Sequence, residues 1–366
     1  SSDKYFDLTY KGKVFGEQDA SLKLFHTIDR LEFVEAFNPL DKDTNTVKLY
    51  GIDGYYSHRF CDILRAMIGY TYQENKINSS VFSKHNYNFK GLYFESELDL
   101  WQRGSLVGGL RWDNYSNFGD RVNPKGGLSI WLYENIKLRA SYGKSFRAPT
   151  FNEIYWPTDD WGLPAMFWPL YGRGATGNTN LDPEKSTSVE AGFTGYFFDA
   201  LQTDVTFFKT KFNDLITWAM DEEWWWRPSN VNSATIKGAE LEVAFDFNDN
   251  LRSNFSYTYL EAIDVNTKKW LINRPRHFYK LKVLYSVTPQ LDIGLGAAYK
   301  TKRFTNPANT FRLKHYYTID LDFNYEASDH LEVLFAIKNI FDQEYQEQRG
   351  YPLPGRTFYG GLKLTF

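Results

Sequence analysis

Hydrophobic and polar residues alternate along much of this chain. In the segment 317–327, YTIDLDFNYEA, apolar or aromatic side chains occupy every second position and polar side chains occupy all positions between them. Because successive side chains of an extended strand point to opposite faces, this period of two predicts a strand with one apolar and one polar face. The pattern recurs in 106–115, 240–247, 255–262, 291–299 and 356–366. By the same criterion the sequence contains roughly 17 strands.

The connections between these strands are of two kinds, short turns and longer links, which alternate along the chain. Short turns are predicted near 15–19, 59–62, 101–104, 132–135, 197–200, 248–250, 288–290 and 327–329, and longer polar links at 38–45, 75–86, 114–121, 149–184, 220–233, 264–276, 301–314 and 342–354. Outer-membrane barrels have short periplasmic turns and long outside loops, whereas a soluble Greek-key sandwich does not sort its links in this way. The sequence therefore predicts an all-β fold, a transmembrane antiparallel up-and-down β-barrel that occupies residues 1–366 as one domain. Its apolar rows face lipid and its polar rows face the lumen.

Aromatic residues, which are 18% of the chain, support this interpretation. Amphipathic rings favour the boundary between membrane and water; ordinary packing is the better explanation of any single ring, but not of the whole set. The aromatic residues expected at this boundary are Trp101, Trp112, Trp131, Tyr133, Phe197, Phe198, Tyr257, Tyr259, Tyr316, Tyr317 and Tyr325.

Charge and the remaining composition exclude several classes of protein. The net charge of −3 lacks the basic excess of a nucleic-acid-binding protein, so no nucleic-acid partner is expected. Cys61 is the single cysteine, which excludes an internal disulfide. No apolar run is long enough for a transmembrane helix. The chain begins SSDKYFDLTYKG without an initiating Met, which indicates a mature or trimmed product.

Several stretches resemble the TonB-dependent outer-membrane receptor family: LRASYGKSFRAPTFNEIYWP (138–157), GNTNLDPEKSTSVEAGFTGYFF (177–198) and IKNIFDQEYQEQRGYPLPGRTFYGGLKLTF (337–366), with 109–138 fitting the preceding strand pair. The resemblance implies the outer membrane of a Gram-negative bacterium and a barrel of about 22 strands closed by a separate plug. This chain is then expected to lack the plug, the N-terminal segment that engages the energy-coupling protein, and about five strands. Ser1 would lie in an external loop. The strands 4–14 and 357–366 would pair with strands that this chain does not contain.

The resemblance also assigns motif residues, for which a structural role is expected. Arg147 shares a strand face with Arg139 and Ser145, so it should point inward and pair with an acid of the lumen or plug. Gly360 departs from the family, which usually has a bulkier residue there. The motif residues are Phe146, Arg147, Pro149, Glu153, Asn178, Leu181, Pro183, Glu184, Gly355, Arg356 and the terminal Phe366.

Two links are unusually rich in large aromatic residues, and these residues are candidate ligand contacts. The alternatives are that the two loops pack on each other as a lid, or contact a partner. Acidic residues in the same loops are weak candidates for a calcium site, although they lack EF-hand spacing and solvated carboxylates are the simpler interpretation. The aromatic candidates are Trp156, Trp161, Trp168, Tyr171, Trp224, Trp225 and Trp226, and the acidic candidates are Asp159, Asp160, Asp221 and Glu222.

The expected function is that of an energy-coupled receptor, which binds a corrinoid such as cobalamin, or a ferric siderophore, and imports it with energy from a TonB-type protein. The compact strands and links resemble the smaller cobalamin-type receptors. Residues 150–177 contain no His, which disfavours haem. No catalytic motif is present, so neither an enzyme nor a resident cofactor is expected. The alternatives are a passive channel and a soluble carbohydrate-binding β-protein, which only the Trp-rich loops support.

Overall fold

The computed structural model describes residues 2–14, 16, 18–34, 42–101 and 103–365. The chain is almost entirely β-structure, with two short helices, α1 (Phe151–Tyr155) and α2 (Trp168–Tyr171), and one 3-10 turn, η1 (Ala165–Phe167). Among the described residues, no helix has the length and apolar character needed to cross a membrane. The chain divides into two compact units: the first contains residues 1–128, 141–187 and 212–233, and the second contains 129–140, 188–211 and 234–366.

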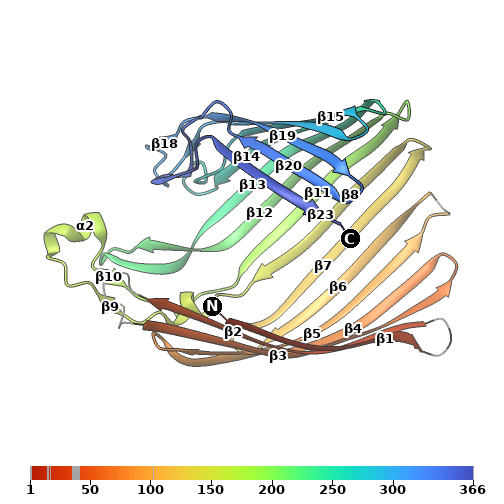
Figure 1. Cartoon of the computed structure of the whole chain (residues 1–366). Helices are drawn as coiled ribbons and strands as arrows, with labels where there is room; N and C mark the ends of the chain where they lie inside the picture. The colour runs from red at the N-terminus through yellow and green to blue at the C-terminus, as the bar shows by residue number, and fades with distance from the viewer. Residues whose placement is uncertain (1, 15, 17, 35–41, 102, 366) are drawn as a thin grey trace. The chain divides into compact units, whose positions relative to one another are not determined.

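Long antiparallel strands build the first unit. The first six strands are β1 (Ser2–Val14), β2 (Gln18–Val34), β3 (Lys42–Cys61), β4 (Leu64–Ser79), β5 (Ser83–Asp99) and β6 (Gly104–Tyr115), and each of β1 to β5 pairs with the strand that follows it. In Figure 1, β2 to β6 run side by side, and α2 belongs to the long loop after β8 (Ile136–Arg147). Five strands contribute residues to both units: β7 (Gly119–Tyr133), β8, β11 (Glu184–Phe197), β12 (Leu201–Met220) and β13 (Trp225–Asn248).

The second unit is also an antiparallel meander. β13 pairs with β14 (Leu251–Asp264), followed by β15 (His277–Thr288), β16 (Leu291–Lys300), β19 (Tyr316–Ser328), β20 (Leu331–Lys338) and β23 (Thr357–Leu364). The short strands of the whole chain are β9 (Asp159–Asp160), β10 (Gly174–Ala175), β17 (Arg303–Phe304), β18 (Arg312–Leu313), β21 (Gln346–Gln348) and β22 (Tyr351–Pro352). The described chain has 17 strands of eight residues or more, so the predicted strand number is confirmed.

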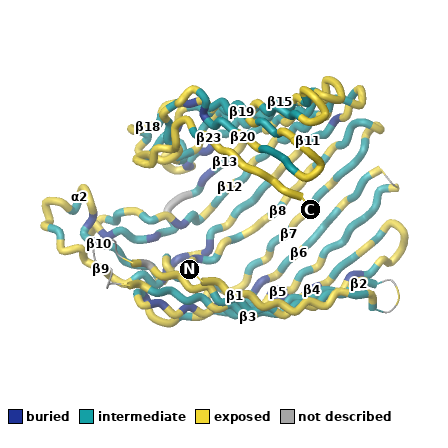
Figure 2. Tube along the Cα trace, in the orientation of Figure 1, coloured by how far each residue is buried: buried dark blue, intermediate teal, exposed yellow. Residues whose placement is uncertain are grey.

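Apolar rows cross these strands without a protein layer over them. In the first unit, Ile68 on β4 pairs with Phe94 on β5, which pairs with Leu110 on β6, and these side chains are 52%, 50% and 50% exposed. Figure 2 shows that buried residues occupy only a few short stretches of the trace. Contiguous exposed apolar surface of this kind is rare in proteins whose surroundings are water.

The opposite face of the same strands carries polar pairs. In the first unit the Thr71 hydroxyl donates to Asp53 at 2.5 Å, and Arg111 pairs with Asp113 at 2.8 Å. In the second unit Leu321 pairs with Leu295 and Ile337, whereas the adjacent Asp322 contacts the Lys338 ammonium at 2.6 Å. The alternation of the sequence therefore becomes two chemically distinct faces, as predicted.

Three of the predicted long links are shorter than expected. β4 and β5 extend to Ser79 and from Ser83, β6 and β7 are separated by residues 116–118 alone, and β13 begins at Trp225. The prediction is wrong there because polar residues at the end of a strand have the composition of a loop, although a strand that projects beyond an apolar layer needs no apolar row. Residues 42–45 of the predicted 38–45 link also belong to a strand, β3, and the rest of that link lies outside the described residues.

The two ends of the chain are long exposed strands. β1 pairs with β2 from Ser2 to Val14, and β23 pairs with β20 from Thr357 to Leu364; almost all positions of both strands are exposed. Pairing of their other edges with strands outside this chain stays a prediction. Ser1 and Phe366 lie outside the described residues. Gly360 lies opposite Phe335 with no atom within 4 Å of where a Cβ would be, so a bulkier residue fits there.

Candidate ligand-binding loops

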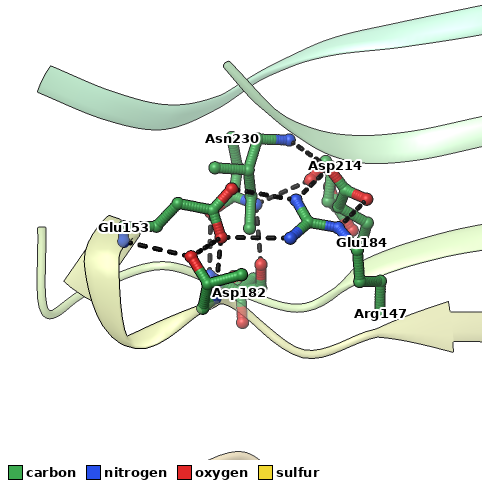
Figure 3. A network of polar contacts seen from close by, with 8 residues as sticks. Arg147, Glu153, Asp182, Glu184, Asp214 and Asn230 are labelled. Atoms are coloured by element: carbon green, nitrogen blue, oxygen red, sulfur yellow. Dashed lines mark hydrogen bonds and ion pairs between the residues drawn. The ribbon is translucent and has the colours of Figure 1, made fainter. Parts of the chain in front are cut away.

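A charged network joins the base of the long loop that follows β8 to its return strand (Figure 3). Arg147, the last residue of β8, donates to both carboxylate oxygens of Glu184 at 2.6 and 2.7 Å and to both oxygens of Glu153 at 3.1 Å. Planar guanidinium–carboxylate pairs of this kind fix geometry as well as charge. The sequence predicts that Arg147 pairs with an acid of the lumen or plug; in the structure its partners are two motif acids of its own chain.

Local sequence explains how the two acids reach Arg147. Thr150 is the N-cap of α1, and its side chain accepts a hydrogen bond from the Glu153 amide while the Glu153 side chain accepts one from the Thr150 amide, which is a capping box. Pro149, just before it, is fully buried. Glu184 begins β11 and also accepts a hydrogen bond from the Ile216 amide of β12 at 2.8 Å. The network therefore connects β8, α1, β11 and β12.

A second set of hydrogen bonds ties the two Trp-rich segments together. Asn230 of β13 donates to the carbonyls of Asp182 and Asp214 at 2.7 Å each and accepts from the Asp182 amide. Asn178 donates to the Pro228 carbonyl at 3.0 Å. Sequence reasoning did not select Asn230, because a single Asn in a polar segment gives no signal of its partners.

The other motif residues hold the backbone or fill small buried spaces. Leu181 is 6% exposed, Pro183 is fully buried, and the Phe146 ring packs edge-on against Tyr115 at 5.2 Å. In the second unit the Arg356 amide donates to Asp342, and a Cβ at Gly355 would lie 2.3 Å from the same carboxylate, so a larger residue there would displace the Asp342 side chain.

Arg173 is the centre of the Trp-rich loops. Its guanidinium carbon lies 5.2 Å from the Trp168 ring centre and 4.8 Å from that of Trp225, and its Nε donates to Asp160 at 3.0 Å. The short strand β10 pairs with β9 on one side and with Trp225 and Trp226 of β13 on the other. The two segments therefore pack on each other, as the lid-packing alternative expects.

The aromatic candidates divide into packed and exposed residues. Trp225 is 7% exposed, the Trp226 indole donates to the Tyr171 carbonyl at 3.0 Å, and Trp156 packs edge-on against Trp218. Trp161, Trp224 and Tyr171 are 44%, 38% and 60% exposed. Met166 of η1 and Leu170 of α2, which are 76% and 72% exposed, were not predicted as candidates. Their spacing of four residues, which places two side chains on one face of a helix, is the signal in the sequence that could have found them. Ligand contact stays a prediction for the exposed group.

The acidic candidates are partly used within the loops. Asp160 pairs with Arg173, and Asp221 accepts the Trp225 amide at 2.9 Å and lies 3.7 Å from Arg227. Asp159 and Glu222 are exposed. Among the described residues, no group of three or more His, Cys, Asp or Glu side chains is placed to hold a metal ion.

The Asp160–Arg173 contact predicts a response of the loops to acid. The Gly162 amide and Arg173 hold the pKa of Asp160 below its usual 3.8. A lowered pKa means that the contact is fully present above the usual value and is lost as pH falls through the lowered one. We expect the tryptophan fluorescence of the loops to be constant from about pH 7 to 5 and to change below about pH 4. Asp160→Asn should show the acid-state signal already at pH 7; an unchanged neutral spectrum would count against this role.

The fold and the sequence together define the class of protein. The family model described as TonB dependent receptor-like, beta-barrel, matches residues 3–340, and the chain belongs to this family. Its strands are those of a transmembrane antiparallel β-barrel of the receptor type.

Individual relatives have low sequence identity to this chain. The chain is 30% identical over 270 residues to the vitamin B12 transporter BtuB of Photobacterium profundum, covering 73% of this chain and 41% of that protein. It is 25% identical over 313 residues to the iron-regulated outer membrane virulence protein of Vibrio cholerae, covering 80% and 46%. Among solved structures, a mutant ferric enterobactin receptor from Pseudomonas aeruginosa in complex with enterobactin superposes with a TM-score of 0.82 at 21% identity, covering 100% of this chain and 62% of that one. The chain thus spans about two-fifths to three-fifths of the length of these proteins.

Proposed function

We propose that this chain is the barrel part of an energy-coupled outer-membrane receptor, which binds a corrinoid such as cobalamin, or a ferric siderophore, outside the cell and imports it. The observation that carries the proposal is the match of residues 3–340 to the receptor-barrel family. Relatives named as vitamin B12 transporters and a fold neighbour named as a ferric enterobactin receptor support the two ligand classes. The proposed partners are outer-membrane lipid, the small-molecule ligand, a TonB-type coupling protein, and a plug with further strands.

The exposed apolar rows support the membrane environment. Residues such as Ile68, Phe94 and Leu110 have no protein layer over them, and lipid satisfies such a surface where water does not. In hydrocarbon every backbone hydrogen bond must be made within the protein, and the continuous antiparallel ladders that join β3, β4 and β5 meet that requirement.

Uptake by the full-length protein tests the function. Cells that carry it should accumulate radiolabelled cobalamin or a labelled ferric siderophore at nanomolar concentration, and dissipation of the proton gradient should abolish accumulation. Uptake that persists without the gradient, together with ion conductance in a planar bilayer, would identify a passive channel instead.

The exposed aromatic residues of the Trp-rich loops are the proposed ligand anchors. Changing Trp161 and Tyr171 together to Ala should weaken binding of the transported ligand by about thirtyfold, since truncation of interface anchors commonly costs about 2 kcal/mol or more. Binding is measured on the purified full-length protein. Trp101→Ala is the control. Trp101 is also an exposed aromatic residue (79% exposed), but it lies in the short turn between β5 and β6 and not in a Trp-rich loop. Equal affinity of the double variant and the control would remove these residues from the binding surface.

A further inference from the structure

The second unit contains a cavity of about 630 Å³ beside the first residue of β19. One wall comes from residues 312–315, in the link between β16 and β19, and the other from residues 344–346, 352, 353 and 355, in the link between β20 and β23. Pockets of roughly 300–1,000 Å³ accommodate small-molecule ligands. The cavity is therefore large enough to hold part of a small-molecule ligand.

Unpaired positive charge lines this cavity. Arg312 and Lys314 are exposed in its wall, and among the described residues neither forms an ion pair or a side-chain hydrogen bond. Glu344 is the one acidic residue of the lining. The nearby Glu347 is occupied, because it pairs with Lys300 and accepts the Tyr316 hydroxyl at 2.6 Å. The wall therefore has an excess of cationic donors whose hydrogen bonds are free for a ligand.

Aromatic rings form a second part of the lining. Tyr316 is only 6% exposed, and its ring centre lies 4.5 Å from that of Tyr345. His315 also lines the cavity, and its ring lies 5.9 Å from that of Tyr299. A planar or apolar ligand body can pack on such rings while a charged group reaches the cations.

Buried contacts hold the two walls in place. Arg303 is 4% exposed, and it donates to the carbonyls of Gln346 at 2.5 Å and Glu347 at 3.4 Å. Its strand β17 pairs with β18, which contains Arg312. The Leu353 amide donates to the Tyr345 carbonyl at 3.0 Å. A site ordered before the ligand arrives loses less conformational entropy on binding.

We propose that this cavity binds an oxyanion group, a carboxylate, phosphate or phenolate, carried by a ligand with a planar or apolar body. Arg312 supplies the planar donor fork that matches two oxygens, and Lys314 supplies a point charge. The oxyanion has two sources, a soluble small molecule or a phosphate-bearing lipid head group of the outer leaflet. The proposal concerns binding alone and does not rest on transport.

Binding of 1-naphthoate to the detergent-solubilised full-length protein tests the site, since this probe joins one carboxylate to an apolar ring system. Arg312→Gln with Lys314→Gln should raise the Kd, measured by fluorescence anisotropy, at least tenfold. Binding to the unaltered protein should weaken as salt is raised, because exposed charges are screened. Heat-modifiable migration on a gel shows whether each variant is folded.

A charge-matched control separates a local site from general attraction. Lys268→Gln with Lys269→Gln removes the same charge from the neighbouring 264–276 link, whose residues do not line the cavity. We expect this control to change the Kd less than twofold. A similar Kd in the unaltered protein and the Arg312/Lys314 variant would overturn the proposal, and so would an equal loss in the control.

The source of the oxyanion is determined by competition. In lipid nanodiscs, displacement of naphthoate by added lipopolysaccharide from the unaltered protein identifies a lipid phosphate as the occupant. Retention of naphthoate, with displacement by millimolar inorganic phosphate, identifies a soluble anion. Both outcomes support the oxyanion site.

Discussion

Replacing Leu321 by Arg should destabilise the folded protein by about 2–4 kcal/mol in a bilayer, the range for a charged residue on the lipid face near the midplane of a β-barrel. Leu321 lies in the middle of β19, and its cross-strand partners Leu295 and Ile337 are also apolar. The introduced guanidinium would therefore lie in hydrocarbon without a partner. The measurement is reversible unfolding in urea, followed by tryptophan fluorescence in lipid vesicles.

Asp322→Arg is the control for this prediction, because the adjacent side chain lies on the polar face. The change removes the 2.6 Å contact with Lys338 and places a like charge near it. Water screens exposed charges, so we expect a cost of about 1 kcal/mol or less. Equal destabilisation by the two substitutions would contradict the assignment of the two faces.

Trp225→Ala should release the loop that contains β9, α2 and β10. Trp225 is 7% exposed, packs on Arg173 and pairs with Gly174, so its removal leaves a cavity and an unstacked guanidinium. Buried Trp→Ala changes cost about 3–5 kcal/mol. Since each 1.4 kcal/mol is about tenfold, amide hydrogen exchange in residues 159–175 should accelerate more than a hundredfold.

The barrel strands provide an internal reference in the same experiment. Exchange in β3 to β5, whose ladders do not involve Trp225, should be unchanged. Trp161→Ala should leave exchange in the loop within a few-fold of the unaltered protein, because this side chain is 44% exposed. Slow exchange in the Trp225 variant would contradict the prediction. It would mean that other contacts hold the loop in place, such as the hydrogen bonds of Asn230 and Asn178.

The sequence by itself determined the fold class, because the relevant signals are local. The alternation in 317–327 places Leu321 and Asp322 on opposite faces of any extended strand, whatever lies beside it. The capping box of Thr150 and Glu153 is likewise a feature of four consecutive residues. Boundaries were less accurate where polar residues continue a strand beyond the apolar layer, as in 75–79, because their composition is that of a loop while their pairing is that of a strand.

Only the tertiary structure decided which candidate residues are free to meet a ligand. Trp161 and Trp225 are the same residue type in similarly polar segments, and nothing local separates them. Pairing of β10 with β13 buries Trp225 against Arg173 and leaves Trp161 exposed. The partners of Arg147 were decided in the same way, because Glu184 lies 37 positions away and reaches it only when β11 returns beside β8. Burial and long-range ion pairs depend on which segments meet, and that information resides in the packing of the whole chain rather than in any window of sequence.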